Sequence, residues 1–258
     1  MKIGISSASL YPLETEKALD FLGENGVEVT EIFFNSPSEL NREFIAELRK
    51  IREYHGIEVC SVHPCGSVGE PYFLFSGYPR RYNDSFEYYK KYYYAAAELG
   101  AKAVVLHGDS LKGHIPMEEY CERLIMMNQA AAEFGVAVCH ENVNRYRGAT
   151  PENILEMRKL TDDKLKFTLD VKQSVRDGCG VDAMYEAMRG NIINVHISDH
   201  NKEVDCMLPG NGDFDFKSLF ERLKSDGYDG ACLIEVYSYA YNDYGEILES
   251  LNKMKKLI

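Results

Sequence analysis

Four side chains that can bind a metal ion stand at the ends of short apolar runs in the second half of the chain. The runs end on Glu141, Asp170, His196 and Glu235, and each run has the length and composition of a buried strand. Three carboxylates and an imidazole that meet around one point need a cation to offset their charge and lost hydration. This oxygen-rich set suits Mn²⁺, Mg²⁺ or Co²⁺ and also accepts Zn²⁺. The pattern therefore predicts one divalent metal ion held by these four residues.

The alternation of side chains indicates that the four groups face one axis. Apart from Ile192 and Leu233, the residues that share the ligand's parity in each run are small or polar, and bulkier apolar residues alternate with them. In the run that ends at His196, for example, Asn194 is expected to point inward and Ile193 and Val195 outward. Because four independent runs agree, we expect their ends to converge.

A cation in this set supports proton transfer next to a carbonyl group. It leaves positions for adjacent oxygens of a polyol or hydroxyketone and stabilises an enediolate. Glu141 and Glu235 are expected on opposite sides of the site, where they can act as general base and general acid on the two faces of a sugar. We therefore expect a metal-dependent isomerase or epimerase acting on a sugar, sugar phosphate or polyol derivative.

Eight strand–helix units in strict alternation must position these residues. The expected strands are 2–7, 27–34, 57–63, 101–107, 136–141, 166–170, 192–196 and 230–237. The expected helices are 15–25, 41–55, 85–99, 116–134, 151–160, 181–188, 215–224 and 244–257. The strands are short and rich in β-branched residues, which is typical of parallel strands covered by helices.

Eight such units in 258 residues predict an α/β fold, a single (β/α)8 TIM barrel over residues 1–258. The alternative is an open doubly wound sheet, which needs a glycine-rich phosphate loop after its first strand. Residues 6–12, at the end of the first strand and just after it, contain no glycine. A barrel also carries its active site at the carboxyl ends of its strands, where the four candidate ligands stand.

Composition excludes several other classes of protein. The net charge of −12, without a basic run, disfavours binding to nucleic acid. No apolar run approaches the roughly 20 residues of a membrane span, and residues 1–5 have strand character without a signal-peptide pattern. Seven cysteines without a CxxC motif are typical of reduced, buried thiols. We therefore expect a cytoplasmic protein without a membrane or nucleic-acid partner.

Five short motifs carry a resemblance to a known family. They are His140-Glu141-Asn142, Leu169-Asp170-Val171, Val195-His196-Ile197-Ser198-Asp199, Pro209-Gly210-Asn211-Gly212-Asp213 and Ile234-Glu235. Over its whole length the chain resembles the xylose-isomerase-like barrel superfamily of sugar-phosphate isomerases and epimerases. That superfamily also contains D-tagatose 3-epimerase-type ketose epimerases and, more distantly, apurinic-site endonucleases. The resemblance implies that the four candidate ligands bind the metal and that Glu141 and Glu235 transfer the proton.

The resemblance also implies substrate-binding roles for His63, His107, Gln173 and Lys202. The two histidines end the third and fourth strands with inward parity; in the endonuclease branch such histidines hold additional zinc ions, and ordinary packing is the competing interpretation. Gln173 replaces the histidine of the family's Asp-x-x-His pattern, so it can offer hydrogen bonds but is a poor metal ligand. Lys202 falls where the epimerases carry a basic substrate-binding residue, although a solvated loop lysine is also expected there.

Three other functions stay open. A dehydratase or lyase acting on a hydroxy-keto acid would use the same first proton abstraction. A zinc phosphodiesterase of the apurinic-site endonuclease type is disfavoured, because Gln173 and the sequence Asp205-Cys206-Met207 lack two of its zinc ligands. A non-catalytic sugar-binding barrel is disfavoured by the complete ligand set. The aromatic segment 64–83 is expected to cover a small-molecule substrate or to form the interface of a homo-oligomer.

Overall fold

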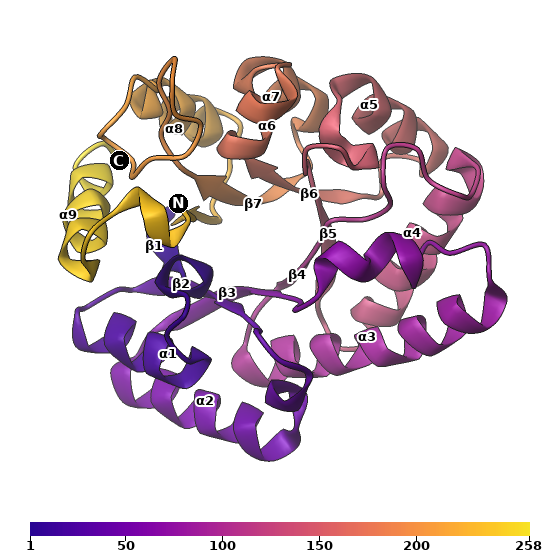
Figure 1. Ribbon diagram of the computed structural model, residues 1–258, viewed down its shortest axis with the longest axis horizontal. Helices are drawn as coiled ribbons and strands as arrows, with labels where there is room; N and C mark the ends of the chain where they lie inside the picture. The colour runs from indigo at the N-terminus through magenta and orange to yellow at the C-terminus, as the bar shows by residue number, and fades with distance from the viewer.

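Eight parallel strands form one closed barrel in chain order, β1 to β8. The computed structural model describes all 258 residues, and Figure 1 shows the ring of strands with helices around its outside. The strands are β1 Lys2–Ser6, β2 Val29–Phe33, β3 Glu58–His63, β4 Ala103–Leu106, β5 Ala137–Glu141, β6 Lys166–Asp170, β7 Ile192–Ile197 and β8 Ala231–Ile234. The predicted (β/α)8 TIM barrel is confirmed, and its closure leaves no unpaired strand edge.

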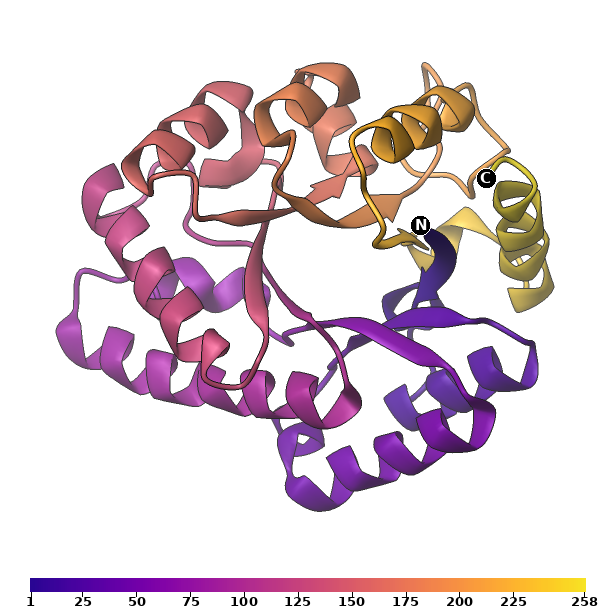
Figure 2. The same cartoon turned by 180° about the vertical axis from the view of Figure 1, so that it is seen from behind.

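Helices follow every strand and cover the outer face of the barrel, as the view from behind in Figure 2 also shows. The α-helices are α1 Thr15–Glu24, α2 Arg42–His55, α3 Pro79–Leu99, α4 Met117–Ala132, α5 Pro151–Leu160, α6 Val171–Asp177, α7 Val181–Met188, α8 Phe216–Ser225 and α9 Tyr244–Lys255. Short 3-10 helices are Ser7–Leu10, Pro37–Leu40, Ser67–Tyr72, Arg147–Ala149 and Ser238–Ala240. None of the helices has the length and apolar composition needed to cross a membrane.

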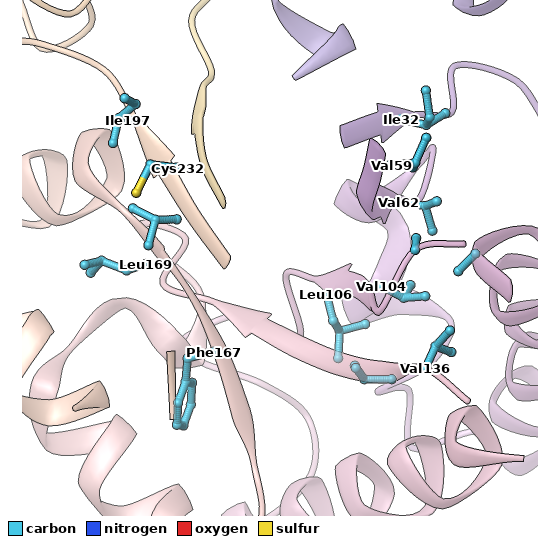
Figure 3. Packing of buried hydrophobic residues seen from close by; sticks show 14 of the residues in the cluster. Ile32, Val59, Val62, Val104, Leu106, Val136, Phe167, Leu169, Ile197 and Cys232 are labelled. Carbon is cyan, nitrogen blue, oxygen red and sulfur yellow. The ribbon is translucent and has the colours of Figure 1, made fainter. Parts of the chain in front are cut away.

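The apolar core has an outer layer and a small inner filling. The outer layer lies between strands and helices and contains 60 buried residues; Figure 3 shows part of it, including Val104, Leu106 and Phe167. The barrel interior holds two clusters of three buried residues each, one around Val29 and one around Val105. Because so few apolar side chains fill the interior, polar groups occupy the rest of it, and these build the site described below.

Most boundaries differ from the prediction by one to three residues, and two helices differ by more. Helix α3 begins at Pro79, six residues earlier than expected, because proline suits the first position of a helix. Helix α6 was not predicted at all. It begins directly after β6, because the carboxylate of Asp170 accepts a hydrogen bond from the backbone N–H of Gln173, 2.8 Å away, and caps the helix. The segment 64–83 accordingly contains a 3-10 helix and the start of α3 rather than one long irregular loop.

The predicted alternation of inward and outward side chains is wrong at one residue. Ile193 was expected to face the helices, but it packs against the inner cluster of Ala103, Val105 and Cys139. The pairing of β6 with β7 is irregular at this point: Phe167 pairs with Ile192, whereas the next residue of β6 pairs with Asn194. The extra residue in β7 reverses the expected direction of Ile193.

Candidate metal and active site

The four residues singled out in the sequence meet at the carboxyl ends of β5 to β8. Glu141 and Asp170 are the last residues of their strands, His196 is in β7, and Glu235 follows β8 directly. One ligand atom from each lies within 4.8 Å of the others. His196 Nδ1 lies 3.2 Å from a Glu141 oxygen, 3.1 Å from a Glu235 oxygen and 3.8 Å from an Asp170 oxygen. The convergence expected from strand parity is thus present.

The donor set, with two carboxylate oxygens that lack a good hydrogen bond, fits a divalent cation. Glu141 Oε2 and Asp170 Oδ2 are buried without a hydrogen bond of good geometry, although His107 Nε2 lies 3.1 Å from the first and Lys172 Nζ lies 3.0 Å from the second. Each carboxylate oxygen can accept more than one partner, so both can still bind a metal ion. Burial, together with the neighbouring carboxylates, raises the pKa of Asp170 to about 7, although Lys172 opposes the shift. Burial also disfavours ionised Glu235, but the attraction of His196 and Lys172 outweighs it and lowers the pKa of that carboxyl.

His63 and His107 form a second group around Glu141. The two Nε2 atoms lie 3.1 Å apart, and Glu141 Oε2 lies 3.1 Å from His107 Nε2 and 3.7 Å from His63 Nε2. These three residues also bring their ligand atoms within 4.8 Å of one another. The two histidines are therefore part of the polar site and not only packed side chains.

Of the other two predicted substrate residues, Gln173 lies beside the metal-binding group and Lys202 lies in an exposed loop. Gln173 connects the ends of β5 and β6. Its side-chain oxygen accepts a hydrogen bond from the backbone N–H of Asn144 at 3.1 Å, and its own backbone N–H donates to the carboxylate of Asp170. Lys202 is exposed in the loop between β7 and α8 and makes no ion pair with the cluster. The structure brings Gln173 beside the metal-binding group and leaves Lys202 away from it.

Two ionisable residues at the site were not singled out in the sequence. Lys172, in the first turn of α6, has a side chain that is 4% exposed, and its Nζ lies 3.0 Å from Asp170 Oδ2 and 3.2 Å from Glu235 Oε2. Glu31, in the middle of β2, is fully buried, and its Oε2 lies 3.2 Å from His196 Nε2. A charged residue inside an apolar strand was the available signal for Glu31. The signal for Lys172 was the N-cap pattern Asp170-Val171-Lys172-Gln173, which can begin a helix directly after the strand.

Neighbouring polar residues hold the strand ends in place. Asn142 bonds the backbone of Asp170 twice, accepting from its N–H at 2.7 Å and donating to its carbonyl oxygen at 3.0 Å. Asp199 accepts four backbone N–H groups, and two of them, from Gly210 and Gly212, close the turn after β7. A Cβ at Gly212 would lie 2.4 Å from the carbonyl oxygen of His200, so only glycine fits there without a shift. These contacts explain structurally why the motifs around Glu141 and His196 extend beyond the ligands.

Comparison with known proteins places this geometry in context. The sequence model of a family described as "Xylose isomerase-like TIM barrel" matches residues 19–257. An uncharacterized protein of Methanocaldococcus jannaschii is 27% identical, over 91% of this chain and 83% of that protein. The 3-dehydro-D-guloside 4-epimerase of Escherichia coli K12 is 24% identical, over 91% of this chain and 92% of that enzyme. The crystal structure of a D-tagatose 3-epimerase-like protein superposes with a TM-score of 0.80 at 24% identity, over 100% of this chain and 97% of the other, which shows a shared fold.

Proposed function

Because the chain belongs to the xylose isomerase-like TIM barrel family, we propose that it is a divalent-metal-dependent isomerase or epimerase of sugars or sugar derivatives. The observation that carries this proposal is the convergence of three carboxylates and one imidazole within 4.8 Å at the carboxyl ends of the strands. The Escherichia coli relative, whose name describes a 4-epimerase of a 3-dehydro-guloside, supports a sugar derivative as substrate.

Glu141, Asp170, His196 and Glu235 would hold one Mn²⁺, Mg²⁺, Co²⁺ or Zn²⁺ ion. When bound, such an ion polarises a carbonyl oxygen of the substrate and stabilises the negative charge that proton abstraction leaves there. His196 would bind through Nδ1, since this is the ring nitrogen that faces the carboxylates. Proton transfer and substrate binding would be carried out by the protein's own side chains.

Glu141 and Glu235 are proposed to move the proton. They come from β5 and from the end of β8, so they approach a substrate in the mouth of the barrel from two sides. Burial opposes ionisation of Glu141, but the adjacent imidazoles of His107, His196 and His63 outweigh it and lower the pKa of that carboxyl, which keeps it in the ionised form that can accept a proton. The ammonium of Lys172 holds Oε2 of Glu235 at 3.2 Å and fixes the direction of the second carboxylate.

His63, His107, Gln173 and Lys202 remain proposed substrate contacts. The two histidines are the best placed of these, because their imidazoles adjoin Glu141 and can bond hydroxyl groups next to the carbon that loses its proton. Lys202 would contact only a substrate that extends to the rim. All seven cysteines are free thiols, which fits the cytoplasmic location that we propose.

A direct test follows the substrate's C–H proton. The Mn²⁺-loaded protein, incubated in D₂O with a panel of ketoses and keto-glycosides, should exchange one C–H proton and form an epimer or isomer, as NMR would detect. Glu141→Gln and Glu235→Gln should each lower the rate about 10²–10⁴-fold, whereas Glu24→Gln, at an exposed position of α1, should not. Equal rates in all four proteins would contradict the proposal; loss of water from the substrate instead would indicate the lyase alternative.

One observation favours a second candidate, a zinc phosphodiesterase. The cluster of His63, His107 and Glu141 could hold another metal ion beside the first, as a multi-metal hydrolase requires. Metal analysis and cleavage assays separate the two candidates. One tightly bound ion and intact abasic duplex DNA support the isomerase, and two or three zinc ions with cleavage support the hydrolase.

A further inference from the structure

Glu31 is a buried carboxylate that approaches the candidate metal ligands from the other side of the barrel interior. Its neighbours are mostly neutral donors: Ser6 Oγ lies 3.1 Å from Oε1, and Ser61 Oγ and Asn194 Nδ2 lie 2.7 and 3.2 Å from Oε2. Its one ion pair is with His196, whose Nε2 lies 3.2 Å from Oε2. Burying a carboxylate without a Lys or Arg partner costs free energy of folding. The contact between Glu31 and the imidazole of His196 therefore calls for a functional explanation.

The other buried acids outside the metal-binding group serve the scaffold. Glu70 accepts hydrogen bonds from the hydroxyl of Tyr89 and the backbone of Gly108. Asp109 pairs with Arg147 at 3.1 Å, and Asp199 closes a turn through backbone groups only. Glu31 differs from them because it touches a residue of the candidate site.

The two ring nitrogens of His196 face two different sets of carboxylates. Nδ1 faces Glu141 and Glu235, and Nε2 faces Glu31. A neutral imidazole carries one N–H, and the nitrogen that binds a metal must be the one without it. If Nδ1 binds the ion, the proton must stay on Nε2, where the carboxylate of Glu31 can accept it.

The position of Asn194 is compatible with either neutral tautomer of His196. Its Nδ2 also lies 3.2 Å from His196 Nε2, and an amide nitrogen can only donate. With the proton on Nδ1, Asn194 could donate to Nε2, and Nδ1 would be lost as a ligand. A carboxylate can only accept, so Glu31 favours the proton on Nε2, and Asn194 then donates to Glu31 instead.

We propose that Glu31 is a positioning residue that holds His196 in its Nε2-protonated tautomer and presents Nδ1 to the divalent cation. This inference rests on the metal site of the proposed function. Glu31 acts through His196 and touches neither substrate nor metal. Residues that orient metal-binding histidines in this way change metal affinity about 10–100-fold when substituted, and we expect an effect of that size.

Metal affinity tests the proposal with a matched control. Mn²⁺ binding, followed by EPR titration of the free ion, should weaken about 10–100-fold in Glu31→Gln, which keeps the shape of the side chain and removes its charge. Ser61→Ala removes a hydrogen bond from the same carboxylate without touching His196, and it should change the affinity less than threefold. Equal Mn²⁺ affinity in the wild type and Glu31→Gln would overturn the proposal. A purely structural role would lower the melting temperature of both variants and leave Mn²⁺ affinity unchanged.

A second measurement needs no variant and so is independent of how well Glu31→Gln folds. Nitrogen-15 NMR of the Zn²⁺-loaded wild type should show the proton of His196 on Nε2 and the metal on Nδ1. The opposite assignment would overturn the proposal. Wild-type protein that binds no Mn²⁺ or Zn²⁺ would contradict the proposed function and this inference together, whereas normal metal binding with the wrong tautomer would contradict this inference alone.

Discussion

The two ends of the barrel contain similar kinds of residue in opposite environments. The amino-terminal end has a hollow of about 1290 Å³, and Lys2, Glu58 and Lys102 are among its lining residues. At this end, Lys2 Nζ lies 2.6 Å from Glu58 Oε2, but the two side chains are 53% and 49% exposed. At the carboxyl end, the candidate ligands are between 0% and 13% exposed. The large hollow therefore lies at the amino-terminal end of the barrel, and the buried charged side chains lie at the carboxyl end.

This difference shows why we place the chemistry at the end with buried charge. An exposed ion pair is screened by water and contributes at most about 1 kcal/mol. Buried carboxylates lose their hydration and must be met by protons, ammonium groups or metal ions within the protein. The carboxyl end has Lys172 and the imidazoles for this purpose and still leaves oxygens of Glu141 and Asp170 without a good hydrogen bond.

The strongest test of the comparison removes one carboxylate charge from each end. Asp170→Asn should weaken Mn²⁺ binding at least 100-fold and lower turnover with it, because a neutral amide replaces one of the three carboxylates offered to the cation. Glu58→Gln should leave both unchanged, since its carboxylate is hydrated and far from the cluster. Metal titration and the exchange assay check both variants, and a similar loss in each would erase the distinction.

The second-largest effect compares two lysines, Lys172 at the carboxyl end of the barrel and Lys2 at the amino-terminal end. Lys172→Met removes the ammonium between two buried carboxylates, so the metal-free protein should lose about 3–5 kcal/mol of unfolding free energy. Saturating Mn²⁺ should restore part of that loss, because binding to the folded state adds stability. Lys2→Met should cost less than about 1 kcal/mol. Urea unfolding measures both, and a small effect of Lys172→Met without metal would show that its ion pairs contribute little.

The smallest effect is the change in metal affinity over a single pH unit. Because the pKa of Asp170 is raised to about 7, this carboxyl holds a proton in the folded, metal-free protein below that pH, and the metal must displace it. Mn²⁺ affinity should therefore rise about tenfold or more per pH unit up to pH 7. Above pH 7 it should rise less steeply, because, despite burial, Glu235 and Glu31 raise the pKa of His196 and the metal must still displace the extra proton of that imidazole. Asp170 has the opposite effect on the stability of the metal-free protein. The free energy of unfolding should fall between about pH 4 and 7, because the unfolded chain loses this proton near pH 4 whereas the folded protein keeps it up to about pH 7. Affinity that is flat across this range would contradict the shift.

The sequence was sufficient for the barrel and for the four converging strand ends, because alternation and strand order are local patterns. It was insufficient where one element alters its neighbour. Ile193 faces inward because β7 carries an extra residue opposite β6. Lys172 reaches Glu235 only because Asp170 caps a helix immediately after its strand. The partner of Glu31 lies 165 residues away, and only the closed barrel shows which residue that is.

The central claim is that one cation joins Glu141, Asp170, His196 and Glu235. Crystals of the Mn²⁺-loaded protein, measured at the manganese absorption edge, test it most directly. We predict one anomalous peak within bonding distance of all four side chains, with Nδ1 of His196 as the imidazole ligand. No peak at this position, or a peak held by other residues, would contradict the account.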